Sequence, residues 1–120
     1  YTTFRFANLR TSTDQLAKNG TVNVSVDVTN TGSRSGDEVV QLYVKHLHSA
    51  VERPREELEG FQRVTLDPGQ TKSVSISLPA SRLAYWNVKT NSFEVETEPV
   101  RLMVGDSSAD LPLNTTVNVQ

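Results

Sequence analysis

The stretch TVNVSVDVTNTGSRSGDEVVQLYV, residues 21–44, decides the fold of this chain. Its first half places a valine at every second position from Val22 to Val28, with polar side chains between them. A period of two with β-branched residues on one face predicts a half-buried β-strand. Small residues and glycines from Asn30 to Gly36 predict a loop. A second strand follows, with one apolar face formed by Val40, Leu42 and Val44. Each of the two strands therefore commits one face to a core.

The same pattern continues to the end of the chain. Further strands are predicted at residues 58–66, 71–78, 93–96, 100–104 and 111–119. Asp67-Pro68-Gly69-Gln70 predicts a tight turn, because proline presets φ and glycine tolerates positive φ. About seven or eight short strands with frequent turns and no long helix are typical of an immunoglobulin-like antiparallel β-sandwich. The predicted fold class is therefore all-β.

Length and composition limit the functions that the chain can have. Its 120 residues fit one domain, and the absence of cysteine excludes disulfides and thiolate metal sites. A net charge of -2 argues against nucleic acid or an anionic membrane as the main partner. No apolar run approaches the roughly 20 residues of a membrane span. The single methionine, Met103, lies inside a predicted strand, so we expect the chain to be a piece of a longer polypeptide.

Three blocks of sequence occur together and in order: VTNTGSRSGDEVVQLYV (28–44), RPREELEGFQRVTLDPGQ (53–70) and VGDSSADLPL (104–113). Through these blocks the chain resembles the C-terminal fibronectin type III-like domain of glycoside hydrolase family 3 enzymes. Residues 1–10 resemble the segment that leads in from a preceding domain, which leaves 11–120 for the sandwich. The chain departs from the family at Thr97-Glu98-Pro99, where a glycine is usual.

The resemblance implies a parent enzyme that hydrolyses terminal β-glycosidic bonds, foremost a β-glucosidase, or otherwise a β-xylosidase or similar exo-acting hydrolase of carbohydrate metabolism. In that family the catalytic carboxylates lie in other domains, so no catalytic residue and no cofactor or metal site is assigned here. The module is then a non-catalytic accessory domain, and its partners are other domains of the same polypeptide. A secreted or periplasmic location is favoured by the resemblance alone. The alternative is an independent carbohydrate-binding or adhesive β-sandwich.

Two groups of titratable residues invite a chemical interpretation. Glu94, Glu96 and Glu98 alternate, and side chains at i and i+2 lie roughly 7 Å apart, within the range for an inverting glycosidase. Catalytic pairs normally come from separate elements with different environments, so we expect a solvated acidic strand edge. His46 and His48 share this spacing, but a metal site needs a third ligand, and we expect polar loop histidines.

The segment 45–57 is polar and contains Pro54, which cannot donate to a β-ladder. We expect a long loop there. Such a loop is either solvated or docked on a neighbouring domain. In the docked case Pro54 would stiffen it, and Arg53 or Arg55 would form bidentate contacts with carboxylates across the interface.

Two adjacent aromatic residues, Tyr85 and Trp86, must face opposite ways in a strand. One of them can pack inside the domain while the other offers a flat surface to the ring of an oligosaccharide. Aromatic side chains more often supply core or interface area, which is the competing interpretation.

Overall fold

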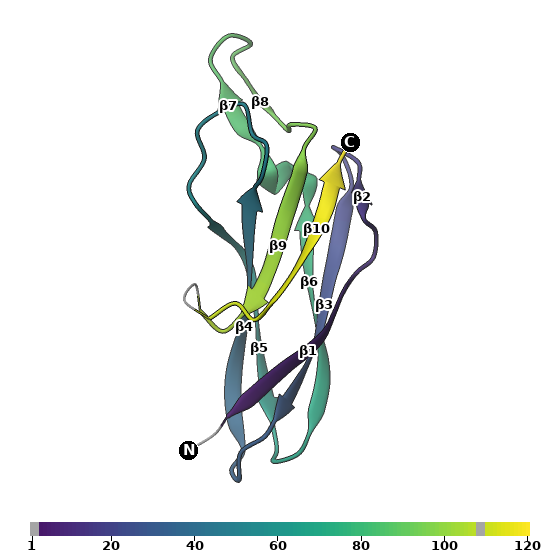
Figure 1. The fold of residues 1–120 in the computed structure, drawn as a ribbon, viewed down its shortest axis with the longest axis vertical. Helices are drawn as coiled ribbons and strands as arrows, with labels where there is room; N and C mark the ends of the chain where they lie inside the picture. The colour runs from purple at the N-terminus through teal and green to yellow at the C-terminus, as the bar shows by residue number, and fades with distance from the viewer. Residues whose placement is uncertain (1–2, 108–109) are drawn as a thin grey trace.

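The computed structural model describes residues 3–107 and 110–120, which form two packed β-sheets and a projecting hairpin (Figure 1). One sheet has the strand order β1-β3-β6, the other β2-β10-β9-β4-β5, and the hairpin is β7-β8. The elements are β1 (Phe4–Thr11), β2 (Gln15–Leu16), β3 (Thr21–Asn30), β4 (Gly36–His46), β5 (Glu57–Leu66), β6 (Thr71–Pro79), the 3₁₀ turn η1 (Ala80–Leu83), β7 (Tyr85–Asn87), β8 (Ser92–Glu94), β9 (Pro99–Gly105) and β10 (Leu113–Val119).

The predicted all-β sandwich is confirmed, with ten strands in the described part of the chain rather than seven or eight. The additional strands β2 and β7 are only two or three residues long, too short to show a pattern of alternating apolar and polar residues. An example is the two-residue β2, which runs parallel to the end of β10. None of the helical segments in the described ranges has the length or apolar character to cross a membrane.

The core forms where alternation predicts it. All four valines of β3 from Val22 to Val28 are buried, and so are the inward residues of β6 from Val74 to Leu78. The central strand β4 contributes Val40, Leu42 and Val44, and β9 contributes Val100, Leu102 and Val104. Burying a branched aliphatic side chain stabilises the fold by about 1.5–3 kcal/mol, so these facing rows hold the two sheets together.

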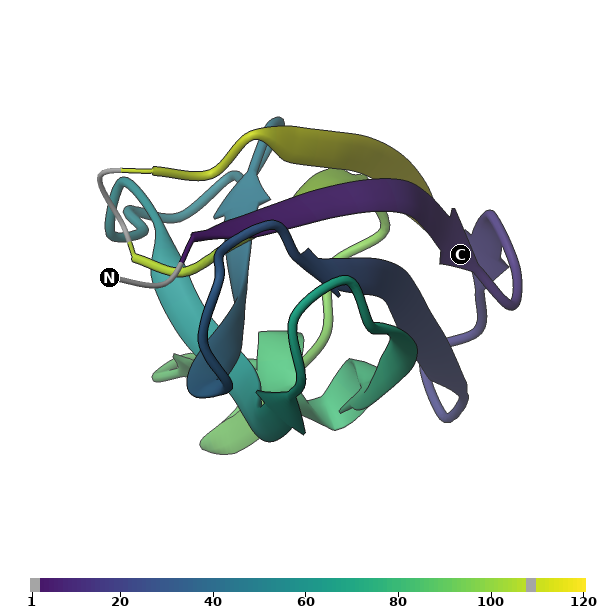
Figure 2. The same cartoon turned by 90° about the horizontal axis from the view of Figure 1, so that it is seen from below.

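One side of the sandwich is closed by β1, which pairs antiparallel with β3 and lies beside β10 (Figure 2). A bulge interrupts the β1 ladder between Ala7 and Arg10, where Asn8 has a φ of 56°. The predicted lead-in segment, residues 1–10, therefore lies largely within β1. Its connection to a preceding domain stays a prediction.

The lower end in Figure 1 is organised by Asn30, which is fully buried. Its side-chain amide donates to the carbonyls of Arg34 (2.8 Å) and Leu66 (3.0 Å), and its Oδ1 accepts from the Gly32 amide (2.9 Å). The amide of Gly69, at a φ of 76°, donates to the Asn30 carbonyl (2.9 Å). Asn30 thus joins both loops at this end through its side chain and its backbone, and Ser35 Oγ links them again by donating to Asp67 Oδ1 (2.7 Å).

The molecule is elongated, with extents of 56 × 24 × 19 Å and a radius of gyration of 15.8 Å. A compact domain of this length would have a radius of gyration of about 14 Å. The excess arises because the β7-β8 hairpin extends beyond the sandwich at its upper end (Figure 1). This end therefore presents more surface than the lower one.

Candidate functional site

The loop between β4 and β5 and the β7-β8 hairpin lie at the same end of the molecule (Figure 1). This loop, residues 47–56, is shorter than the predicted 45–57. The prediction was wrong at its ends because β4 continues to His46, where its backbone pairs with Val100 of β9, and β5 begins at Glu57. Polar side chains hide this pairing, since a β-ladder is made by backbone groups.

Arg53, one of the three predicted docking residues, turns into the domain, and its side chain is 10% exposed. Its guanidinium donates to Glu96 Oε1 (2.8 Å), to the Leu83 carbonyl (3.0 Å) and to Ser49 Oγ (3.2 Å). Its Cζ atom also lies 5.3 Å from the centroid of the Tyr85 ring, within the range of a cation–π contact. Arg53 therefore fixes the loop to η1, to β7 and to the segment that follows β8.

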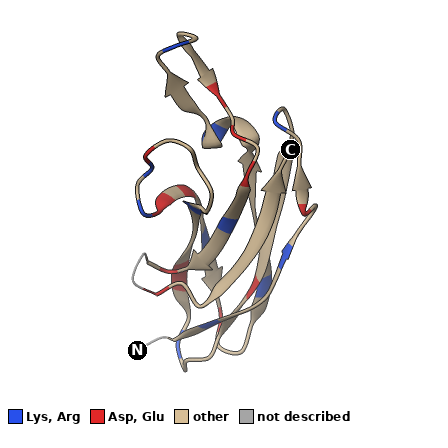
Figure 3. Ribbon diagram, turned by 45° about the horizontal axis from the view of Figure 1, so that its top comes forward, with Lys and Arg blue, Asp and Glu red and all other residues tan. Residues whose placement is uncertain are grey.

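The other two predicted docking residues, Pro54 and Arg55, are exposed. They follow the anchored Arg53 directly and are held at the surface by it. Figure 3 shows charges of both signs on the loop 47–56 and acidic residues along the connection from β8 to β9. The structure thus places the predicted docking loop against the segment that carries the three glutamates.

The prediction of a solvated acidic edge was wrong for Glu96 and Glu98. The side chain of Glu98 is 2% exposed and that of Glu96 is 13% exposed. Glu98 lies two residues before Val100, so it continues the inward-facing row of β9 rather than the outer one. Its Oε2 meets His46 Nδ1 at 2.8 Å, and its Oε1 accepts from the His48 amide at 3.1 Å.

The prediction of two loop histidines was also wrong for His46, which ends β4 with a side chain only 3% exposed. Its Nε2 lies 3.2 Å from Arg53 Nη1. Because a guanidinium can only donate, His46 Nε2 must accept, and the ring proton is on Nδ1, where it is donated to Glu98. His46 is thus a neutral bridge between a buried cation and a buried carboxylate.

Glu96 is an ionised anchor for the loop. Burial acts to raise its pKa, but hydrogen bonds from the Ser49 hydroxyl, the Ala50 amide (2.8 Å) and Arg53 outweigh burial and lower the pKa overall. The pKa of Glu94 is lowered as well, chiefly by the side-chain amide of Asn87 at 2.7 Å. A glycosidase needs one carboxyl group whose pKa is raised so that it can donate a proton. Neither Glu94 nor Glu96 meets this requirement.

The hairpin separates the two aromatic candidates, as their adjacency predicts. Tyr85 faces the loop beneath Arg53, whereas Trp86 points outward and is 48% exposed. Trp86 pairs across the hairpin with Phe93, and their rings meet edge to face with centroids 4.9 Å apart. Phe93 is 72% exposed, and Val88 in the turn is 81% exposed. Three large apolar side chains are therefore presented to solvent on this hairpin.

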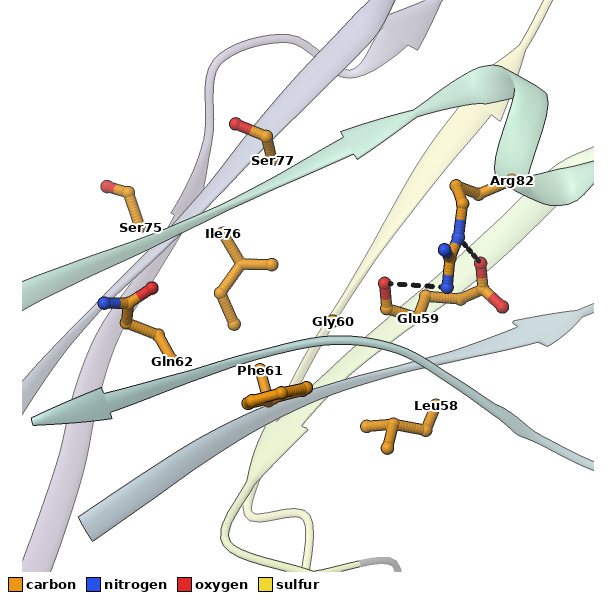
Figure 4. A pocket seen from close by; sticks show the side chains of 9 residues that line it. All are labelled: Leu58, Glu59, Gly60, Phe61, Gln62, Ser75, Ile76, Ser77 and Arg82. Carbon is orange, nitrogen blue, oxygen red and sulfur yellow. Dashed lines mark hydrogen bonds and ion pairs between the residues drawn. The ribbon is translucent and has the colours of Figure 1, made fainter.

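A groove of about 540 Å³ lies between β5 and β6, at the open side of the sandwich (Figure 4). It exists because a β-bulge places Glu59 between the residues paired with Leu42 and Tyr43, and because β5 approaches β6 at Gly60. A Cβ on Gly60 would lie 2.6 Å from Ile76 Cγ2. Glu59 is the only carboxylate among the residues lining this groove, and it pairs with Arg82 at 3.3 Å. The groove thus lacks the two carboxylates that glycoside hydrolysis requires.

The family model of the fibronectin type III-like domain matches residues 38–108, more than half of the chain. The chain belongs to the fibronectin type III-like domain family. The domain is 39% identical to the thermostable β-glucosidase B of Acetivibrio thermocellus over 99% of its own length and 16% of that protein. It is 43% identical to a β-xylosidase of Formosa agariphila, covering 90% of this chain and 15% of that protein.

The crystal structure of a Bifidobacterium adolescentis GH3 β-glucosidase contains the same fold, with a TM-score of 0.91 and 34% identity. The match covers 99% of this chain and 17% of that one. The fibronectin type III-like domain described here thus spans about one sixth of the length of these relatives. In each of them it is one part of a larger chain.

Sequence reasoning missed the pairing of His46 with Glu98 at the centre of the fibronectin type III-like domain's upper end. The missing signal was the phase of the alternation. His46 follows Val44 by two residues, and Glu98 precedes Val100 by two, so both continue rows that were already assigned to the core. In the described residues no group of three His, Asp or Glu side chains is arranged to hold a metal ion.

Proposed function

We propose that this fibronectin type III-like domain is a non-catalytic accessory part of a family 3 β-glycosidase, foremost a β-glucosidase, and that it braces a neighbouring catalytic domain. One observation carries the proposal. Nearly the whole of this chain is similar to a segment that makes up about one sixth of the length of β-glucosidases and of a β-xylosidase. The environments of Glu94 and Glu96 support a structural role, since both pKa values are lowered. Burial raises the pKa of Glu59, but this carboxyl group pairs with Arg82 and has no second carboxylate beside it in its groove.

Bracing requires a surface that docks and a scaffold that keeps it rigid. The upper end offers Pro54 and Arg55 on the loop and Trp86, Val88 and Phe93 on the hairpin. Aromatic and arginine side chains are enriched at interfaces, and arginine binds carboxylates through two parallel hydrogen bonds. Arg53 acts through the loop as a positioning residue, while Arg55 makes the contact across the interface.

The test uses the full-length polypeptide that carries this domain. Arg55→Ala should lower its melting temperature or its rate of hydrolysis of a chromogenic β-glucoside. Arg5→Ala, an exposed arginine on β1 away from this end, is the matched control and should change neither. Docking through Arg55 is wrong if Arg55→Ala behaves like Arg5→Ala. The accessory role is wrong if residues 1–120 alone hydrolyse the glycoside.

A second candidate function, an independent carbohydrate-binding module, is favoured by one observation: the half-exposed indole of Trp86 beside Phe93. Sugar rings stack on such surfaces through their apolar faces. Trp86 is the only tryptophan of the chain, so its fluorescence can follow a titration with cello- or xylo-oligosaccharides. A saturable shift that Phe93→Ala weakens would support this function. An unchanged spectrum at millimolar sugar would remove it.

A further inference from the structure

The outer faces of the two sheets differ in how completely their polar groups are paired. On the three-stranded sheet, hydroxyls and amides of β3 and β6 pair directly across the ladder. The pairs are Thr29 with Thr71 (2.6 Å), Ser25 with Ser75 (2.7 Å), Ser73 with Asp27 (2.7 Å) and Ser77 with Asn23 (2.8 Å). The polar side chains of this face hydrogen-bond to one another, so the face does not need a partner domain to pair them.

The outer face of the five-stranded sheet carries two cations side by side. Lys45 of β4 and Arg101 of β9 are register partners. Both alternate with buried residues, so both side chains leave the sheet on its outer face. Like charges directly opposite each other on neighbouring strands destabilise a sheet. In residues 3–107 and 110–120 neither cation has an ion-pair partner.

Arg101 has a second deficit. Its Nε atom is buried and has no hydrogen-bond acceptor among the described residues. A buried donor without an acceptor keeps its full desolvation cost, and native structures rarely leave one unpaired. Nε itself is covered by the domain, so a partner reaches only the part of the half-buried Arg101 side chain that stays exposed, and an acceptor there would compensate the charge of the guanidinium. A carboxylate is the best fit, because it binds a guanidinium through two parallel hydrogen bonds and also neutralises Lys45.

Apolar side chains adjoin the two cations. Tyr43 is the register partner of both Met103 and Leu58, and Phe61 lies opposite Gln41 one pair along. Leu58 is 46% exposed and Phe61 is 67% exposed. In Figure 4 both project from β5 on the side away from Ile76, toward the outer face. The Tyr43 hydroxyl donates to Gln41 Oε1 (2.7 Å), which fixes the aromatic ring in place.

We propose that this cationic and apolar face, formed by Lys45, Arg101, Tyr43, Met103, Leu58 and Phe61, docks a carboxylate-bearing segment of another domain of the same polypeptide. The proposal rests on the proposed function only in taking the chain to be one domain of a longer protein. It adds a second contact surface and the chemistry of its partner. Charge complementarity selects the acidic partner.

The charges also argue against a second copy of this chain as the occupant. A two-fold dimer uses the same patch on both copies, so it would bring the lysine and arginine of one copy against those of the other. A neighbouring domain has no such constraint. The relatives are about six times longer than this chain, so such domains are available in them.

The test is zero-length cross-linking of the full-length polypeptide with a carbodiimide, which joins a lysine amine to a carboxylate in direct contact with it. We expect a peptide containing Lys45 to be joined to an Asp or Glu outside residues 1–120. Lys45→Arg keeps the charge but should abolish this product. Lys72, an exposed lysine on β6 away from both proposed contact surfaces, is the matched control and should give no comparable product. Mixed isotope labelling separates cross-links within one chain from those between chains.

A second measurement separates docking from folding. Arg101→Met should leave the melting temperature of the 120-residue chain unchanged or raise it, because it removes an unpaired donor and a repulsive neighbour. In the full-length protein the same substitution should reduce the Lys45 cross-link and lower the melting temperature, in contrast to its effect on the 120-residue chain. A cross-link only within residues 1–120, one only between copies, or none overturns the proposal. If the cross-link forms in a protein without glycosidase activity, the docking face stands and the proposed function fails.

Discussion

At the lower end of the sandwich one neutral side chain, Asn30, gathers the loops, whereas at the upper end a network of His46, Arg53, Glu96 and Glu98 does so. The Asn30 amide spans two short connections with three hydrogen bonds. The charged network anchors a ten-residue loop and the base of a projecting hairpin. The upper end, with its longer loop and projecting hairpin, is therefore held by buried charged groups, which lose more hydration free energy on burial than a neutral amide does.

The two solutions respond differently to damage. A neutral amide that is lost leaves a few backbone groups without partners, each costing about 1–3 kcal/mol. A member of a buried ionic pair that is lost leaves a charge without compensation, which costs about 3–5 kcal/mol. Mutations of Asn30 and of the charged network should therefore differ in size, and those in the charged network should also depend on pH.

The largest effect is expected for Glu98→Ala at the upper end. The substitution removes the acceptor of His46 Nδ1 and of the His48 amide, and it leaves a cavity because the Glu98 side chain is buried. Two buried donors lose their acceptor, at about 1–3 kcal/mol each, and the cavity adds to the loss, so the free energy of unfolding should fall by about 3–5 kcal/mol, measured by urea denaturation. Glu98→Gln, which keeps an acceptor and the volume, should lose less. A loss below 1 kcal/mol for Glu98→Ala would show that this carboxylate does not anchor the upper end.

The matching change at the lower end, Asn30→Ala, should cost about 2–3 kcal/mol. It strands the carbonyls of Arg34 and Leu66 and the amide of Gly32. Asn30→Asp has the same shape but cannot donate to either carbonyl, so it should be at least as damaging. Urea denaturation at pH 7 and pH 3 should give the same loss for Asn30→Ala. A loss that changes with pH would contradict the assignment of Asn30 as a neutral anchor.

The lower end and the core were largely predictable because each sheet has one wet face. The valines of β3 mark the buried face at every second residue, and the serines of β6 mark the exposed face in the same way. The sequence Asp67-Pro68-Gly69-Gln70 predicts the turn between β5 and β6. What alternation cannot supply is a count of short strands. Pairings such as β2 with β10 last two residues and are set by the backbone of a strand far away in sequence.

The upper end was less predictable because polarity was taken to mean exposure. Glu98 and His46 are polar, yet they occupy inward positions of β9 and β4 and satisfy each other there. Neither residue alone indicates burial, since a lone buried carboxylate would be prohibitively unstable. Arg53 was assigned to an interface for the same reason, because its partners on η1 and on the segment after β8 are remote in sequence. The phase of the strand, followed past its last apolar residue, was the available signal.

A smaller effect, and one confined to the upper end, is expected for Glu96→Gln. Folding lowers the pKa of Glu96, so its ionised form contributes stability in full above the ordinary glutamate pKa of about 4.3, and this contribution is lost as the pH falls through the lowered value. The stability difference between the wild-type protein and Glu96→Gln should be largest near pH 7 and should shrink below about pH 4.

Other acidic groups titrate in the same range but cancel in that comparison. The pKa of Asp27 is lowered to about 2, first by the Asn8 side chain and then by Ser73, and Asp27 is present in both proteins. Chemical denaturation across pH 3–7 measures the difference directly. If the loss caused by Glu96→Gln is as large at pH 3 as at pH 7, the ionised carboxylate is not what holds the loop.

The smallest loss of unfolding free energy is expected for Trp86→Ala, on the exposed hairpin of the upper end. Trp86→Ala removes one ring of the edge-to-face pair with Phe93, and such pairs are worth about 0.5–1.5 kcal/mol. In the 120-residue chain the loss should stay near 1 kcal/mol, far below that of Glu98→Ala. In the full-length protein a hairpin that docks should lose more on the same substitution, because its apolar surface is then buried against a neighbour. Equal losses in the two contexts would mean that the hairpin faces water, and the charged network beneath it would then support the loop alone.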